Sequence, residues 1–231
     1  MGARLDDIWD RQWLLGWRDI TGAEKIRTVI PCIIPRAAAN HTFPLMMTPS
    51  DPQLVAGLYA NLSSIPFDYC ARQKVGGTHL TFFTMRQLPG FRPGTYATPA
   101  PWSPSTRVRD WLLPRVLELT YTAWDLEAFA EDCGDDGPPF IWDFERRLQL
   151  KCEIDAAFFH LYGIPQDDAA HILDTFPVLA RSEEREHGEY RTKREVLETY
   201  DALVAAAAKG IPYQSPLGPP RRATTLRASY R

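Results

Sequence analysis

The sequence lacks the features that mark metal-binding, disulfide-stabilised and membrane proteins. Its four cysteines are widely separated and form no CxxC pair, whereas a zinc site or a disulfide framework needs closer, patterned spacing. No apolar run approaches the roughly 20 residues that cross a bilayer, and the first residues form no apolar signal segment. We therefore expect free thiols, no metal site, no membrane contact and a cytoplasmic location.

Motifs for catalysis are missing as well. Residues 136–140 read Asp-Gly-Pro-Pro-Phe, close to the Asp/Asn-Pro-Pro-Tyr/Phe motif with which amino-group DNA methyltransferases hold an extruded base. Gly137 stands where that motif has its amide or carboxylate, which favours a simple loop between helices. No glycine-rich turn follows a buried strand to cradle a cofactor. The carboxylates of residues 143–155 alternate with apolar positions, which favours a solvated helix face over a nuclease metal site. We predict no catalytic residue and no bound cofactor in this chain.

Charge is distributed unevenly along the chain. The net charge is -3, yet residues 1–92 carry ten Lys and Arg against seven Asp and Glu. Residues 110–210 are strongly acidic, and the last dozen residues hold four arginines and no acid. A basic front and an acidic back are typical of a protein that contacts a polyanion through one face.

The first 92 residues predict a mixture of strands and helices. Short apolar runs at 13–17, 28–34 and 43–47 predict strands, and Pro31 indicates an edge position or a bulge in the second of them. Asp51 and Pro52 are a helix-start signal, and Pro66 interrupts the apolar helical pattern that follows. Residues 81–85 predict a further strand.

The rest of the chain predicts helices. Residues 93–105 are dense in Pro, Gly, Thr and Ser, which is typical of a linker. Apolar residues then recur at helical spacing over 110–129, 143–162, 166–176 and 189–209. The prediction is an α+β fold, with a small mixed α/β domain over 1–92, a Pro-rich linker over 93–105, a mainly helical domain over 106–210 and a disordered basic tail over 211–231.

One segment combines side chains suited to nucleic acid. Arg72, Gln73 and Lys74 stand at a predicted helix end, and two glycines separate them from Thr78 and His79. Arg and Gln pair with guanine and adenine edges, while Lys, Thr and backbone amides suit phosphate. The same residues would also serve as a helix C-terminus with basic residues favoured by the helix dipole, followed by a tight turn. Physical reasoning alone leaves both interpretations open.

Several segments together resemble a known family. They read WRDIT at 17–21, RTVI at 27–30, PR at 35–36, NLSS at 61–64, ARQKVGGTHL at 71–80, FF at 82–83, QLP at 87–89, ELTYTAWDL at 118–126, DTFP at 174–177 and GEYRTKR at 188–194. As a set they are similar to the C-terminal portion of large bacterial adenine-specific DNA methyltransferases of restriction-modification and phage-defence systems. In that family the methyltransferase domain, with its S-adenosylmethionine, lies upstream of this portion.

The resemblance implies a DNA target-recognition role without catalysis. Residues 1–92 would be the target-recognition-like domain, and double-stranded DNA and a methyltransferase domain or subunit would be the partners. The contact loop would comprise Arg72, Gln73, Lys74, Thr78 and His79. Supporting phosphate contacts would come from Arg18, Arg27 and Arg36. Two alternatives stay open, namely a module that docks on a separate methyltransferase subunit without touching DNA, and a non-functional truncated remnant.

Overall fold

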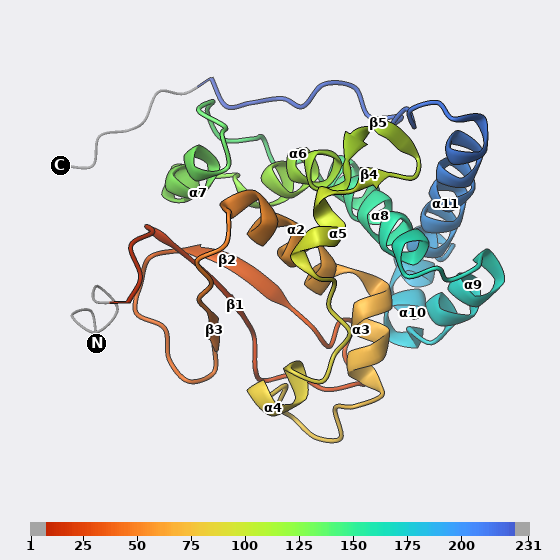
Figure 1. Cartoon of the computed structure of the whole chain (residues 1–231). Coiled ribbons are helices and arrows are strands. Elements are labelled where there is room, and N and C mark those ends of the chain that lie inside the picture. Colours follow the sequence, from red (N-terminus) through yellow and green to blue (C-terminus); the bar gives the residue numbers. More distant parts are fainter. Residues whose placement is uncertain (1–7, 225–231) are drawn as a thin grey trace.

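The first apolar run forms the centre of a three-stranded antiparallel sheet. In the computed structural model, which describes residues 8–224, β1 (Trp13–Trp17) lies between β2 (Pro31–Pro35) and β3 (Leu45–Met46). Every residue of β1 is buried, as its unbroken apolar sequence predicts. Pro31 pairs with Trp17 on the edge strand β2, which confirms the expected edge position. The sheet lies to one side of a larger set of helices, and the fold is α+β as predicted (Figure 1).

Two consecutive helices follow the sheet. Asp51 caps α2 (Pro52–Ser63) by accepting a hydrogen bond from the Gln53 backbone N–H, and Pro52 occupies the first turn. Ser64 is extended, and α3 (Ile65–Arg72) then starts with Pro66 in its first turn. The proline therefore divides the expected helical stretch into two helices.

Residues 81–107 differ from the sequence prediction. The strand expected over 81–85 is the short helix α4 (Phe82–Met85), because the Thr81 side chain caps its N-terminus. The expected linker contains α5 (Pro93–Ala97) and a hairpin of β4 (Pro99–Ala100) and β5 (Ser103–Arg107). Trp102 is completely buried there, so this segment is part of the core. The linker was predicted from composition alone, and Pro and Gly also occur in turns that pack tightly against a core.

The remaining helices follow the predicted pattern with two differences. The first expected helix is divided into α6 (Val108–Thr120), a single 3-10 turn η1 (Trp124–Leu126) and α7 (Glu127–Asp132). Helix α10 (Pro177–His187) was not anticipated. The other three helices lie where they were expected: α8 (Phe144–Leu161) with Asp143 as its cap, α9 (Gln166–Asp174), and α11 (Arg191–Lys209) ending at Gly210 in the left-handed conformation.

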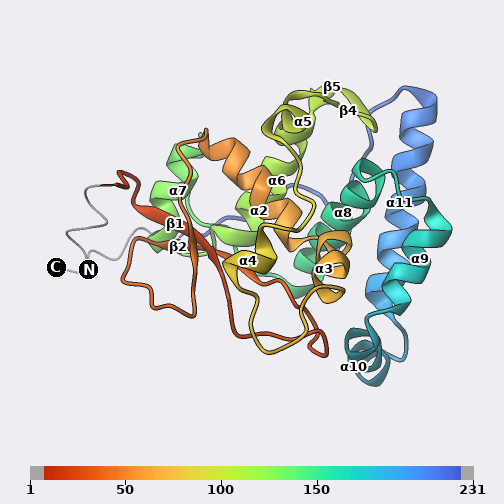
Figure 2. The ribbon, with the colours of Figure 1, turned by 60° about the horizontal axis from the view of Figure 1, so that its bottom comes forward.

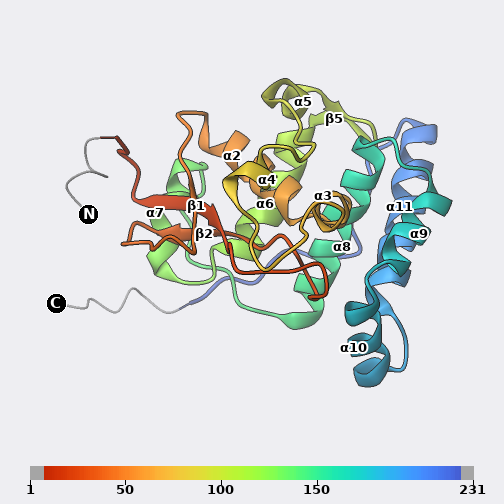
Figure 3. The ribbon, with the colours of Figure 1, turned by 90° about the horizontal axis from the view of Figure 1, so that it is seen from below.

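One hydrophobic core runs across the expected domain boundary. It joins Trp13 and Leu14 of β1 to Trp111 of α6, Phe158 of α8 and Leu203 of α11. Helix α2 packs along α6, and α8 packs along α11, so the helices form successive layers outward from the sheet (Figures 2 and 3). A smaller cluster around Trp17, Phe67 and Leu80 lies where α3 meets the end of β1.

The chain after α11 returns across the helices toward α7 (Figure 1). The Tyr213 N–H donates to the Trp102 carbonyl at 2.8 Å, and the Ala223 N–H donates to the Pro139 carbonyl at 2.8 Å. The expectation of a disordered tail is therefore wrong for residues 211–224, because backbone pairing and ion pairs hold them. The rest of that expected tail, 225–231, lies outside the described residues.

Asp155 is a buried carboxylate that connects α8 to α3. Its Oδ1 accepts a hydrogen bond of 2.7 Å from the Ile65 backbone N–H, in the first turn of α3. Burial raises the pKa of Asp155 to about 6, even though nearby Arg27 and this hydrogen bond act in the opposite direction.

We expect Asp155 to make the protein less stable as the pH rises from about 4 to about 6. The folded protein binds this proton more tightly than the unfolded chain, whose Asp carboxyls ionise near pH ~3.9, so the stabilisation is full below that pH and is lost through the folded pKa. Asp155→Asn keeps an oxygen acceptor for Ile65 and removes the titration. Urea unfolding at several pH values should show a flatter profile for this variant, whereas exposed Asp136→Asn should keep the wild-type profile. An unchanged profile in Asp155→Asn would contradict the assignment.

Candidate nucleic-acid interface

Asp68 organises the base of the segment expected to contact DNA. This carboxylate lies on α3, is completely buried, and accepts hydrogen bonds from the backbone N–H groups of Thr28 and Val29 at 2.9 and 3.1 Å. It also accepts from Arg27 Nε at 2.8 Å and from Arg72 Nε at 3.0 Å. A single carboxylate thereby fixes the connection between β1 and β2 against α3.

Arg72 is occupied within the protein. Besides Asp68, its guanidinium donates to the backbone carbonyls of Ala23, Lys25 and Ile26 at 2.7–3.1 Å, and its side chain is only 7% exposed. Its Cζ lies 3.9 Å from the centroid of the Phe176 ring. The expected contact of Arg72 with a base edge therefore needs correction, because its donors are used to hold a loop.

Arg27 and Arg36 also serve internal contacts. Arg27 binds Asp68 and donates to the Ser63 carbonyl, although about a quarter of its side chain stays exposed. Arg36 donates to the carbonyls of Trp9 and Arg11 at 2.6 and 3.1 Å, which ties the chain before β1 to the end of β2. Both residues have structural roles that the sequence pattern did not reveal.

The structure brings the Thr78–His79 segment against the end of β1. The Thr21 N–H donates to the Thr78 carbonyl at 3.0 Å, and the Leu80 N–H donates to the Asp19 carbonyl at 2.8 Å. His79 Nδ1 lies 2.9 Å from Asp19 Oδ2, and half of the His79 side chain is exposed. Arg18 is exposed beside this pairing, so 18–20 and 78–80 form one surface although 60 positions separate Asp19 from His79.

Several polar side chains of residues 18–86 are free to contact another molecule. Within the described residues, Arg18, Gln73, Lys74 and Arg86 are exposed, and their side chains make no hydrogen bond or ion pair. An added Cβ at Gly76 or Gly77 would meet no atom within 4 Å, so another molecule can approach this backbone closely.

A signal for this surface is present in the sequence but was missed. No Asp or Glu occurs between Asp68 and Asp110, whereas this stretch contains Arg72, Lys74, Arg86, Arg92, Arg107 and Arg109. Such an acid-free run in a chain of net charge -3 favours contact with a polyanion.

Phe83 adds an exposed aromatic ring to this stretch. It is 79% exposed on α4, while the adjacent Phe82 packs edge-on against Trp17 with ring centroids 4.8 Å apart. The anchored neighbour fixes the position of the short helix, so Phe83 stays at the surface.

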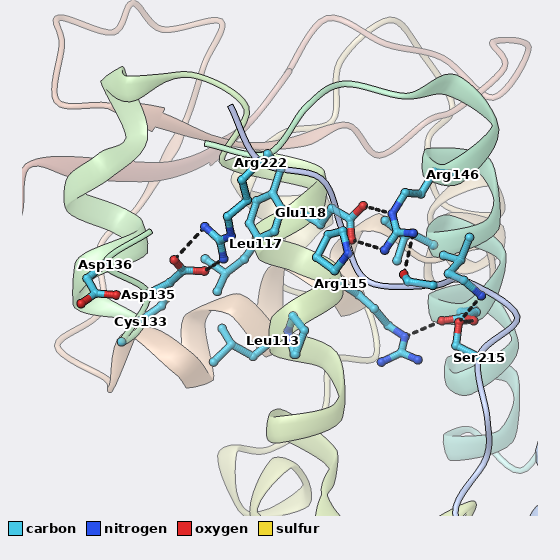
Figure 4. Close-up of a pocket in the computed structure, with 18 residues that line it drawn as sticks. Leu113, Arg115, Leu117, Glu118, Cys133, Asp135, Asp136, Arg146, Ser215 and Arg222 are labelled. Carbon is cyan, nitrogen blue, oxygen red and sulfur yellow. Dashed lines mark hydrogen bonds and ion pairs between the residues drawn. The ribbon is translucent and has the colours of Figure 1, made fainter. Parts of the chain in front are cut away.

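A second feature is a cavity of about 500 Å³ between α6, the 133–140 loop and the returning C-terminal segment (Figure 4). Most of its charged groups face one another in pairs. Arg115 Nε binds Glu153 at 2.7 Å, Arg146 binds Glu118, and Arg222 binds both carboxylate oxygens of Asp135 at 2.6 and 3.0 Å. Arg222 holds the C-terminal segment directly, while Arg146 donates to its Gly218 carbonyl and Glu153 accepts from its Ser215 hydroxyl.

The Arg222 side chain packs against residues 136–140, the loop that resembles a methyltransferase motif. A Cβ on Gly137 would meet the Arg222 guanidinium at 2.6 Å, and the Arg222 Cζ lies 3.9 Å from the centroid of the Phe140 ring. Phe140 is buried and therefore has no free face for a base. These contacts support the interpretation of residues 136–140 as a loop between helices.

The comparisons give no relative for this chain. No family model matches it, and neither the curated proteins nor the solved structures contain a significant match. In residues 8–224 no three His, Cys, Asp or Glu side chains are grouped as a metal site would require. No helix of that same stretch has the length and apolar character to pass through a bilayer.

Proposed function

We propose that this chain is the DNA-binding specificity region of an adenine-specific DNA methyltransferase of a restriction-modification or phage-defence system. It would bind duplex DNA and position a catalytic methyltransferase domain or subunit. That partner would supply the S-adenosylmethionine site and transfer the methyl group. The chain would have no catalytic activity alone.

The observation that carries this proposal is the set of exposed, unpaired cations near the Thr78–His79 segment, where Asp19 is the acid that pairs with His79. Lys74, Arg18 and Arg86 are exposed there without internal partners, and free Lys and Arg side chains bind phosphates by releasing counterions. Gln73 and Thr78 offer hydrogen-bonding groups that can read base edges or sugar and phosphate oxygens. With Arg72 held inside, the proposed contact set consists of Arg18, Gln73, Lys74, Thr78, His79 and Arg86.

The test is duplex DNA binding by the purified chain across a salt series, with a random-sequence pool as ligand. We expect affinity that falls steeply with salt and selection of one short sequence from the pool. Absence of binding at low salt would overturn the proposal.

Lys74→Ala should weaken binding to all DNA sequences alike. A lysine that contacts phosphate releases about 0.9 of a counterion, so the slope of log affinity against log salt should decrease by roughly one unit. Lys209→Ala, which removes an exposed charge from the last turn of α11, should leave both quantities unchanged. Equal effects of the two substitutions would show that only net charge matters.

The alternative is a module that docks on a separate methyltransferase subunit. Exposed apolar side chains at the start of α8 favour it, because Trp142 is 53% and Phe144 79% exposed, with ring centroids 5.9 Å apart. In that case Trp142→Ala would abolish assembly with the subunit, and the chain alone would not bind DNA.

A further inference from the structure

A second, smaller cavity lies between the start of β2, the end of α2 and the middle of α8. Its volume is about 190 Å³, well above the roughly 10–15 Å³ that a cavity needs to hold one water. Three cationic side chains line it: Arg27 from the connection between β1 and β2, and Arg147 and Lys151 from α8. None of these three residues lines the larger cavity of Figure 4.

The positive charges of this cavity exceed the negative ones. Asp155 is the only carboxylate among the described residues that line it, and burial raises its pKa. Arg147 is positioned by its bond to the Leu119 carbonyl at 2.9 Å and by stacking 3.5 Å from the centroid of the Trp142 ring. Neither contact neutralises its charge.

Lys151 is the cation without a partner. In the described part of the chain its ammonium makes no hydrogen bond or ion pair, although Arg27 and Arg147 line the same cavity. Lys151 is exposed at the edge of the cavity, and desolvation of its ammonium together with the repulsion of these two guanidinium groups lowers its pKa. Arg27 is paired with Asp68, whereas Arg147 and Lys151 have no carboxylate partner among the described residues, and such cations favour binding of an anion.

We propose that this cavity binds a phosphate group, through Lys151, Arg27 and Arg147. Arg147 and Arg27 are held by their internal bonds, so they would present a fixed positive wall at little further cost in side-chain entropy. Lys151 would close on the phosphate as the mobile donor. Tyr59, whose pKa is raised by burial, stays protonated and adds a neutral hydroxyl to the lining.

Calorimetric titration of the full chain with inorganic phosphate tests this proposal. We expect saturable binding with one site, and an affinity at least tenfold lower for Lys151→Met, since a hydrogen bond to a charged group typically contributes about 1.5–3 kcal/mol. Lys151→Arg should restore most of the affinity. Lys209→Met, which removes an equal charge from the end of α11, should bind as the wild type does. Absent saturable binding, or an unchanged affinity in Lys151→Met, would overturn the assignment.

A competition experiment distinguishes the two sources of phosphate. If phosphate displaces bound duplex DNA and Lys151→Met weakens DNA binding, the cavity takes a phosphate of the DNA backbone. If DNA binding is unaffected while phosphate binding is lost, the cavity takes a free phosphate compound. Either result supports the cavity as a phosphate site, and both are independent of the Lys74 result, so this proposal and the proposed function can fail separately.

Discussion

Asp68→Asn is expected to lower the free energy of unfolding by about 3–5 kcal/mol, the range for breaking a buried ion pair by removing one partner. The carboxylate is completely buried and receives donors from Arg27, Thr28, Val29 and Arg72. An asparagine of nearly the same shape has no charge to balance two guanidinium groups. Its amide nitrogen would also face donors where the carboxylate accepted bonds. The loss should appear in urea unfolding as a lower midpoint with an unchanged slope.

The matched control is Asp136→Asn. Asp136 is exposed in the 133–140 loop, so this substitution should change stability by less than about 0.5 kcal/mol. A mild effect of Asp68→Asn would mean that Arg27 and Arg72 are not held by this carboxylate. In that case both arginines would again be candidates for DNA contacts.

Trp102→Ala is expected to cost about 3–5 kcal/mol, the range for removing a large buried aromatic ring. Trp102 follows β4, is completely buried, and packs edge-on against Trp111 and His160 with centroids 5.1 and 5.7 Å away. Its backbone carbonyl also accepts the Tyr213 N–H, so the substitution should loosen the C-terminal segment too. If Trp102 lay in an exposed linker, its substitution would neither lower the stability nor loosen the C-terminal segment.

Two further substitutions make this prediction specific. Trp142→Ala removes the same kind of side chain from an exposed position and should cost less than about 1 kcal/mol. Trp102→Phe should cost less than Trp102→Ala, because it keeps most of the ring contacts and removes an indole N–H that has no partner in the described residues. If all three variants had the same free energy of unfolding, the burial of Trp102 would not be the cause of the lost stability.

The sequence predicted the elements whose signals are local. The unbroken apolar run of β1, the Asp51–Pro52 start of α2 and Gly210 after α11 each specify structure within a few neighbouring residues. The α+β class follows from such signals. The errors occurred where a local signal was ambiguous, as in α4, where a threonine cap outweighed β-forming residues.

The candidate site was predicted only in part. Sequence reasoning selected Lys74, Thr78 and His79, which are exposed in the structure, but it could not separate free arginines from occupied ones. Arg72 and Arg27 were expected to reach DNA, and both bind Asp68. Arg86 was missed, although the acid-free stretch that contains it can be read from the sequence.

By itself, then, the sequence determined the fold class, the positions of most helices and strands and the basic character of one loop, because hydrophobic period, capping and charge are properties of neighbouring residues. Only the tertiary structure decided which cations are available. A guanidinium has five donors, and whether water, DNA or a carbonyl accepts them depends on groups far away in the chain, such as Asp68 for Arg27 and Asp135 for Arg222. The same long-range packing made residues 93–105 part of the core and gathered Arg27, Arg147 and Lys151 around one cavity.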